Sequence, residues 1–169
     1  MTTIATYAYS RTHSVTFVAD SMRTALIRLI EGLGLQPDAL LDDWKIVGQA
    51  VKTWLESGHL TAVTIEFYVP GASVASARWD IPVAYDGNGV ADDMWLDRDH
   101  LARTIAKSTL PPANAKYRLV LSAEAGRAEI AAMGPAELRS VSAMLGRSAG
   151  TIIASPAITA GLTYWKSRT

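Results

Sequence analysis

The stretch AYDGNGVADDMW, residues 84–95, gathers carboxylate and amide oxygens, the ligands that Ca²⁺ and Mg²⁺ prefer. An EF-hand loop beginning at Asp86 would need an oxygen ligand at its fifth position, Gly at its sixth and Glu at its twelfth. The chain instead has Val90, Ala91 and Asp97 at these positions. The spacing therefore excludes an EF-hand.

The same residues are well suited to a turn followed by a helix. Gly87 and Gly89 can adopt positive φ, as a turn after a strand requires. Asp92 and Asp93 are acceptors suited to cap a helix beginning at Met94 and Trp95. We interpret the stretch as a turn and a cap, with an opportunistic divalent cation as the alternative.

The histidines offer little further chemistry. His13, His59 and His100 are too far apart to form a metal-ligand motif. In DRDH, at the start of a helix, Asp97, Asp99 and His100 would face different directions, which favours solvated charges over a site. His59 follows a Gly that would end a helix, where a role at the helix C-terminus is expected.

A serine nucleophile is also disfavoured. GRSAG, residues 146–150, places Ser148 third, as in a nucleophile elbow, but no strand is expected before it. We predict no catalytic residue, metal or cofactor. A small hydrolase or metal-dependent enzyme using His100 with Asp97 and Asp99, or His59, is the rival hypothesis.

Composition describes a soluble globular chain of one domain. The 169 residues are 49% hydrophobic, carry a formal net charge of zero and include no Cys. This composition excludes disulfides and gives no electrostatic signature of nucleic-acid binding. No run approaches the roughly 18 apolar residues of a membrane span. With no recognisable export signal at the N-terminus, we expect a cytoplasmic protein.

Periodicity predicts the elements that position these residues. Residues 6–17 alternate and predict a strand, followed by a helix that begins at Asp20 and ends at Gly34. A second helix is expected to begin after Asp42 or Asp43 and to end at Gly58, with Trp44 and Trp54 in its apolar stripe.

The middle of the chain predicts a hairpin over residues 61–85, a third helix that includes Leu96 and Ile105, and a strand over residues 117–123. Pro82 lacks an N–H donor and suits an edge strand or a bulge. The order of elements indicates an α+β domain with helices on one face of an antiparallel sheet.

The remainder, residues 126–169, is rich in Gly, Ala and Ser and has weak periodicity. The sequence there is compatible with a helix over 135–145 and also with a strand at GTIIAS, and such a segment is often disordered or a part that moves. Tyr164 and Trp165 near its end suggest an aromatic anchor, or otherwise an interface hot spot.

Several runs resemble bacterial HORMA-domain proteins, specifically bacterial HORMA family 1. They are THSVTFVADSMRTALIRLI, WKIVGQAVKTWLESGHLTAVTIEFY, RWDIPVAY, MWLDRDHLARTIAK, YRLVLS and TYWK. The resemblance implies a helical layer packed on a three-stranded antiparallel sheet with a C-terminal safety belt. It implies a single domain over 1–169, with a core over 1–125 and the belt over 126–169.

The resemblance also implies function. HORMA domains are switches whose belt wraps a closure-motif peptide of a partner protein. Bacterial members resemble antiphage defence regulators whose closed form binds and activates a cyclic-oligonucleotide synthase of the CD-NTase class. An AAA+ remodelling ATPase would reverse closure by engaging the N-terminus.

Carried onto this chain, the resemblance implies that the peptide adds to the edge of strand 117–123, facing Tyr117, Leu119 and Leu121. The belt would be hinged and anchored by Gly126, Gly134, Gly146, Gly150, Tyr164 and Trp165.

Two non-enzymatic alternatives stay open. This chain could donate a closure motif to a sister HORMA protein, or it could be a scaffold whose tail never moves. Deleting the residues after about Gly126 is expected to leave a soluble core that no longer retains a peptide.

Overall fold

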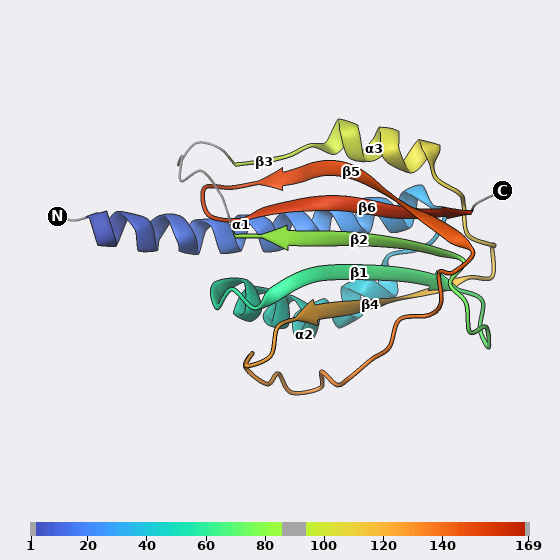
Figure 1. Ribbon diagram of the computed structural model, residues 1–169, viewed down its shortest axis with the longest axis horizontal. Coiled ribbons are helices and arrows are strands. Elements are labelled where there is room, and N and C mark those ends of the chain that lie inside the picture. Colours follow the sequence, from blue (N-terminus) through green and yellow to red (C-terminus); the bar gives the residue numbers. More distant parts are fainter. Residues whose placement is uncertain (1–2, 86–93, 168–169) are drawn as a thin grey trace.

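A computed structural model describes residues 3–85 and 94–167, with side chains from Arg11 onward (Figure 1). Three helices and six strands follow one another along this part of the chain. Their order is α1 (Thr3–Gly32), α2 (Asp38–Glu56), β1 (Leu60–Tyr68), β2 (Ala77–Ala84), β3 (Trp95–Leu96), α3 (Arg98–Lys107), β4 (Lys116–Ala123), β5 (Met144–Ala154) and β6 (Thr159–Ser167).

The strands form one antiparallel sheet in the order β3-β5-β6-β2-β1-β4. Helices α1 and α2 lie behind this sheet in Figure 1. The α+β class is confirmed. The expected three-stranded sheet corresponds to β1, β2 and β4, and the strands of the C-terminal region extend it on the β2 side.

The start of α1 corrects one prediction. Residues 6–17 were expected to form a strand, but they belong to a helix of 30 residues. Val15, Val18 and Met22 are buried at helical spacing, so the period of 3.6 that dominates later residues begins inside the alternating stretch. The alternation of the earlier residues was incidental.

Helix α2 begins earlier than predicted, at Asp38 rather than after Asp42 or Asp43. Pro37 precedes it, and its fixed φ suits a helix start without a side-chain cap. Its end agrees with the prediction, because Gly58 has a φ of +77° and the N–H of His59 donates to the carbonyl of Trp54. Gly34 likewise follows the end of α1, with a φ of +86°.

Strand β2 is central in the sheet, although Pro82 suggested an edge or a bulge. Its pairing with β6 runs from Arg78 to Asp80 and resumes at Val83, leaving out Ile81 and Pro82. The missing N–H therefore interrupts one ladder and not the whole strand.

Helix α3 begins at Arg98, and its N-cap is Asp97, whose carboxylate accepts from the backbone N–H of His100. Met94 and Trp95 do not start this helix as predicted, because Trp95 and Leu96 form β3. The expected turn at Gly87 and Gly89 and the caps Asp92 and Asp93 lie outside the described residues.

The C-terminal region is a structured part of the sheet. Residues 124–143, here called the crossing segment, contain no helix, and β5 and β6 form a hairpin that follows them. Ile152, Ile153 and Leu162 of this hairpin are buried in the same core as α1. A deletion after Gly126 would therefore remove part of the core, contrary to our expectation of an intact remnant.

Among the described residues, no helix is long and apolar enough to cross a membrane.

Candidate functional site

Strand β4 lies at one edge of the sheet. It pairs with β1 along its length, and no described strand pairs with its other side. Leu119 and Leu121 lie opposite Ile65 and Val63, which are fully buried on the helical side of the sheet. Because side chains alternate along a strand, Arg118 and Val120 face the other side. The free backbone groups of β4 form a template for an additional strand.

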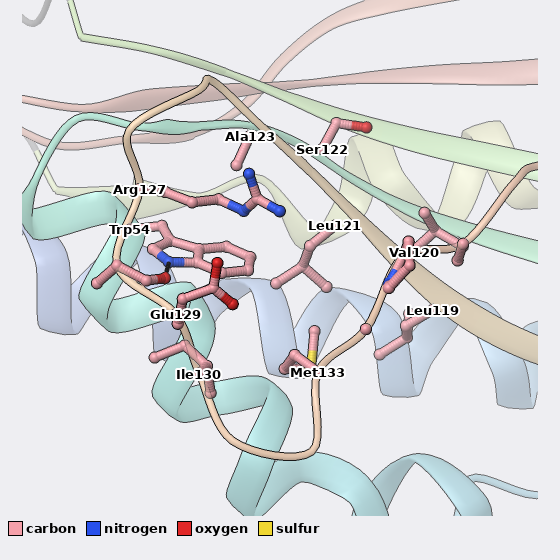
Figure 2. A pocket seen from close by; sticks show the side chains of 14 residues that line it. Trp54, Leu119, Val120, Leu121, Ser122, Ala123, Arg127, Glu129, Ile130 and Met133 are labelled. Carbon is pink, nitrogen blue, oxygen red and sulfur yellow. Dashed lines mark hydrogen bonds between the residues drawn. The ribbon is translucent and has the colours of Figure 1, made fainter.

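A pocket of about 520 Å³ lies between β4 and the crossing segment (Figure 2). This volume is in the range of roughly 300–1,000 Å³ typical of ligand sites. Of the large apolar side chains that line the pocket, five also belong to the core or pack against it, and they are Trp54, Leu119, Leu121, Ile130 and Met133. In Figure 2 the crossing segment leaves the end of β4, curves past Ile130 and Met133, and returns towards Val120.

Hydrogen bonds hold residues 124–128, the first part of the crossing segment, against α2 and the start of β1. The N–H of Glu124 donates to the carbonyl of His59 at 2.9 Å. The indole N–H of Trp54 donates to the carbonyl of Ala128 at 2.9 Å, and the guanidinium of Arg127 lies 5.4 Å from the centre of the Trp54 ring. A single aromatic side chain thus supports the segment through its N–H and its π face.

The last part is fastened to β1 by a buried carboxylate. The side chain of Glu66 has no solvent exposure and accepts from the backbone N–H of Arg139 at 2.9 Å and from its guanidinium at 2.6 Å. Arg118 also donates to Glu66, and it donates to the carbonyl of Glu137. This arrangement satisfies a buried charge with three donor groups.

Burial would by itself raise the pKa of Glu66. Hydrogen bonds from Arg139 and Arg118 outweigh burial, so the pKa of Glu66 lies below its ordinary value of 4.5. Glu66 is therefore ionised at neutral pH and attracts both arginines.

Three further contacts hold this end of the crossing segment. The guanidinium of Arg139 lies 3.6 Å from the centre of the Tyr68 ring and donates to the carbonyl of Ala72 at 3.1 Å. Ser140 forms a parallel bridge with Val74, beside the loop that joins β1 and β2. The segment is thus held at both ends, while its middle spans the pocket.

The crossing segment also changes sides of the sheet. Met133 packs against the core on the helical side, whereas the carbonyl of Glu137 meets Arg118 on the opposite side. Between these residues the chain passes around the unpaired edge of β4. A strand added to β4 would therefore lie inside the arc of the crossing segment.

The structure places the predicted edge-strand residues in two environments. Leu119 and Leu121 line the pocket. Tyr117 is turned towards the start of α2, where its hydroxyl donates to the carbonyl of Gln36 at 2.7 Å, and its ring lies 5.9 Å from that of Phe67. Burial raises the pKa of Tyr117 above its ordinary value of 10.0. Tyr117 positions β4 and does not line the pocket.

The predicted hinge glycines are dispersed. Gly126 has a φ of +89° at the start of the crossing segment, and Gly134 lines the pocket. Gly146 and Gly150 belong to β5, where Gly150 has a φ of +80° at a register irregularity. Only the first two could act on the crossing segment itself, and a hinge role for all four stays a prediction.

Tyr164 and Trp165 join the C-terminal hairpin to β2. The ring of Tyr164 stacks on that of Trp79 with centroids 5.2 Å apart. The indole N–H of Trp165 donates to the carboxylate of Asp80 at 2.9 Å, and the guanidinium of Arg78 lies 5.0 Å from its ring. These contacts agree with an aromatic pair that anchors β6 to β2. That the pair anchors a moving belt stays a prediction.

The residues of the rival enzyme hypothesis have structural partners. One ring nitrogen of His100 lies 2.7 Å from the carbonyl of Ala149, which joins α3 to β5. Asp97 caps α3, and Asp99 is exposed. His59 directly precedes β1, beside the end of β4, and its ring contacts the hydroxyl of Ser57 at 2.7 Å. In the described part of the chain, no cluster of His, Asp or Glu could hold a metal ion.

Ser148 lies in β5, where its hydroxyl accepts from the N–H of Gly150 at 3.2 Å. No described hydrogen bond links it to a histidine. This placement does not resemble a strand-to-helix nucleophile elbow.

Sequence reasoning missed several residues of this site, among them three that hold the crossing segment. Trp54 was assigned to the core alone, and Glu66 and Arg139 were not singled out. A Glu at the centre of an alternating strand was the available signal for Glu66, since an unpaired carboxylate is rarely tolerated there. No sequence pattern identified Arg139 as its partner.

Comparisons with known proteins place this geometry in context. A family model described as bacterial HORMA domain 2 matches residues 1–168. A search of curated protein sequences found no match. The expectation of a bacterial HORMA domain is confirmed, although the matching model describes family 2 and the resemblance pointed to family 1.

Solved structures share the fold at low sequence identity. A chain of a mitotic checkpoint complex aligns with a TM-score of 0.73 at 7% identity, covering 92% of this chain and 99% of that one. A HORMA:CdnC:Trip13 complex from E. coli MS115-1 gives 0.57 at 14%, covering 92% and 90%. C. elegans HTP-2 bound to a HIM-3 closure motif gives 0.53 at 11%, covering 73% and 68%.

Proposed function

The chain belongs to the bacterial HORMA domain 2 family, and from this premise we propose that it is a peptide-binding conformational switch. In this proposal the crossing segment closes over a closure-motif peptide beside β4. The closed form then binds and activates a CD-NTase synthase in antiphage defence signalling.

One observation carries the proposal: the unpaired edge of β4 and the pocket beside it lie inside an arc of chain that is fastened at both ends. A peptide that pairs with β4 would gain main-chain hydrogen bonds from the strand and side-chain contacts from the pocket. The arc would then retain it.

Related assemblies support the proposed partners. The HORMA fold occurs with CdnC and Trip13 in the complex from E. coli, and with a closure motif in the C. elegans complex. We extend these partners to this chain as a CD-NTase, an AAA+ ATPase and a closure-motif peptide.

Contacts between α1 and the C-terminal hairpin suggest how an ATPase that pulls on the N-terminus would destabilise the hairpin. The hydroxyl of Ser14 in α1 accepts from the N–H of Ala157, in the turn between β5 and β6, at 3.2 Å. Val15 and Val18 of α1 belong to the same core as Ile153 of β5. Pulling α1 away would therefore remove contacts that hold the hairpin in place.

The test is a disulfide that locks the crossing segment. Val74 and Ser140 are bridge partners, and the natural chain has no Cys, so Val74→Cys combined with Ser140→Cys introduces one bond. Neighbouring strand positions lie within the Cα separation of about 4.4–6.8 Å that a disulfide needs.

The oxidised double variant should fail to capture a purified CD-NTase and its closure peptide when they are added afterwards. It should retain partners that were bound before oxidation, and reduction should restore exchange. The single Ser140→Cys variant serves as the control. Equal capture by oxidised and reduced protein would contradict movement of the segment, and no capture in any state would contradict the proposed function.

A further inference from the structure

One residue in the middle of the crossing segment has a backbone conformation that its own side chain disfavours. Ala132 has a φ of +70°, and among the described residues it is the only one other than glycine with a positive φ. A Cβ crowds the neighbouring carbonyl in this left-handed region, at a cost equivalent to about five- to thirtyfold in an equilibrium constant. The backbone at Ala132 is therefore strained.

The strained residue belongs to a tight turn. The N–H of Met133 donates to the carbonyl of Ile130 at 3.1 Å. The two residues between them, Ala131 and Ala132, are therefore the centre of a β-turn. A positive φ at the second central position alone is the feature of a type II turn, which favours Gly or Asn there. The chain has Ala at this position, and Gly134, two residues later, lies outside the left-handed region.

Contacts at the two ends of the turn keep the strained conformation in place. Ile130 and Met133 are partly buried and pack against the core, and the chain curves back between them (Figure 2). A strained residue persists only where the surrounding contacts determine its conformation. Ala131 and Ala132 are exposed, so their own side chains add no buried contact. The strain is retained while Ile130 and Met133 stay packed, and it is released when either leaves the core.

We propose that the strain at Ala132 favours opening of the crossing segment. It lowers the free-energy difference between the packed and detached forms of residues 130–133, so the segment spends a larger fraction of its time open. This inference rests on the proposed function, in which the segment must open to exchange a partner. Gly126 does not have this effect, because its φ of +89° is one that glycine adopts without strain.

The test compares substitutions at Ala132 with the same substitutions at Ala131. Both residues are exposed, but only Ala132 has a positive φ, so the pair isolates the backbone effect from the loss or gain of a side chain. The readout is the exchange rate of the amide hydrogen of Met133, measured by NMR on the full chain without a partner. This amide donates to Ile130 across the turn, and its exchange therefore reports opening.

Ala132→Gly should slow this exchange by about two- to tenfold, because relief of the strain exceeds the flexibility that Gly adds to the open segment. Ala132→Asn should also slow it, which separates tolerance of positive φ from the flexibility of glycine. Ala132→Val should accelerate exchange by about tenfold, because β-branched residues tolerate positive φ least. Ala131→Gly should accelerate it by about two- to fivefold, since this change adds flexibility and relieves no strain.

Unchanged or faster exchange in Ala132→Gly, or the same direction of change at both positions, would overturn the strained turn. A second measurement follows the release of a fluorescently labelled CD-NTase that was captured together with its closure peptide. Its half-life should lengthen in Ala132→Gly and shorten in Ala132→Val by factors similar to those for exchange. Equal half-lives despite altered exchange would overturn the role of the strain in opening for release. No capture by the natural protein would contradict the proposed function, and the exchange series would still decide whether Ala132 is strained.

Discussion

The guanidinium of Arg139 lies 2.6 Å from the carboxylate of Glu66, a side chain with no exposure to solvent. Glu66 belongs to β1, and Arg139 belongs to the crossing segment that passes around the far edge of β4. This pair links the centre of the sheet to the part of the chain that we propose to move. It is therefore the contact whose removal should most directly release the crossing segment.

Glu66→Gln keeps the shape of the side chain and removes its charge. We expect a loss of roughly 2–3 kcal/mol in the free energy of unfolding, because charge-assisted hydrogen bonds to both arginines are weakened. Hydrogen exchange should accelerate in residues 134–140. Glu137→Gln makes the same change of charge in an exposed residue and keeps the carbonyl that Arg118 uses, so it should show neither effect.

Acid should act on the same contact. Since the pKa of Glu66 is lower in the folded protein than its ordinary value of 4.5, the folded state binds fewer protons near that pH. Its stabilising contribution is complete above the ordinary value and is lost as the pH falls through the folded pKa. The difference in melting temperature between the natural protein and Glu66→Gln should shrink between neutral and strongly acidic pH. A constant difference would contradict this account.

Trp54→Phe tests the contacts that hold the first part of the crossing segment against α2. The variant keeps an aromatic ring in α2 and loses the hydrogen bond to Ala128. We expect a loss of about 1–2 kcal/mol from the hydrogen bond and the weaker cation–π contact with Arg127. Exchange of residues 126–130 should increase about tenfold if this loss is local. Unchanged exchange there would show that Trp54 does not hold the segment.

The C-terminal hairpin has its own matched pair of variants. Tyr164→Ala removes the ring that stacks on Trp79 and should lower the free energy of unfolding by about 2 kcal/mol. Tyr164→Phe keeps the stacked ring and should change it by less than about 0.5 kcal/mol. Chemical denaturation followed by tryptophan fluorescence measures both. Equal effects would place the contribution in the hydroxyl and not in the stacking.

His100→Ala separates the switch from the rival enzyme. The change removes the contact with the carbonyl of Ala149 and should cost about 1 kcal/mol of stability. Peptide capture should persist, because His100 joins α3 to β5, and β5 and β4 are separated in the sheet by three strands. A hydrolytic activity that this variant abolished would support the enzyme hypothesis.

Local signals made part of the fold predictable. The hairpin of β1 and β2 and the strand β4 were found from alternation, and Gly34 and Gly58 marked helix ends because positive φ favours glycine. The start of α1 was wrong because a short alternating run preceded the first buried positions of a long helix. Period-two and period-3.6 patterns overlap in such short windows.

The site was less accessible to sequence reasoning because its contacts are long-range. Leu119 and Leu121 could be placed on one face of a strand, but Glu66 and Arg139 are separated by 73 residues. Their pairing depends on the crossing segment passing around β4, which no local pattern encodes. Trp54 was correctly expected in an apolar stripe. Its ring lies at the margin of the core, however, and its indole N–H donates to the crossing segment at Ala128, which the stripe does not indicate.

The arc of the crossing segment has a kinetic consequence. If an occupant lies between β4 and a covalently continuous loop, it cannot leave sideways until one end of the loop detaches. Its residence time would then follow the local opening rate of this chain, and the strength of its own contacts would count for less. Peptides of different equilibrium affinity would leave at similar rates and differ mainly in how fast they are captured. The contacts of Glu66 and Trp54 would then determine how long a captured peptide stays bound.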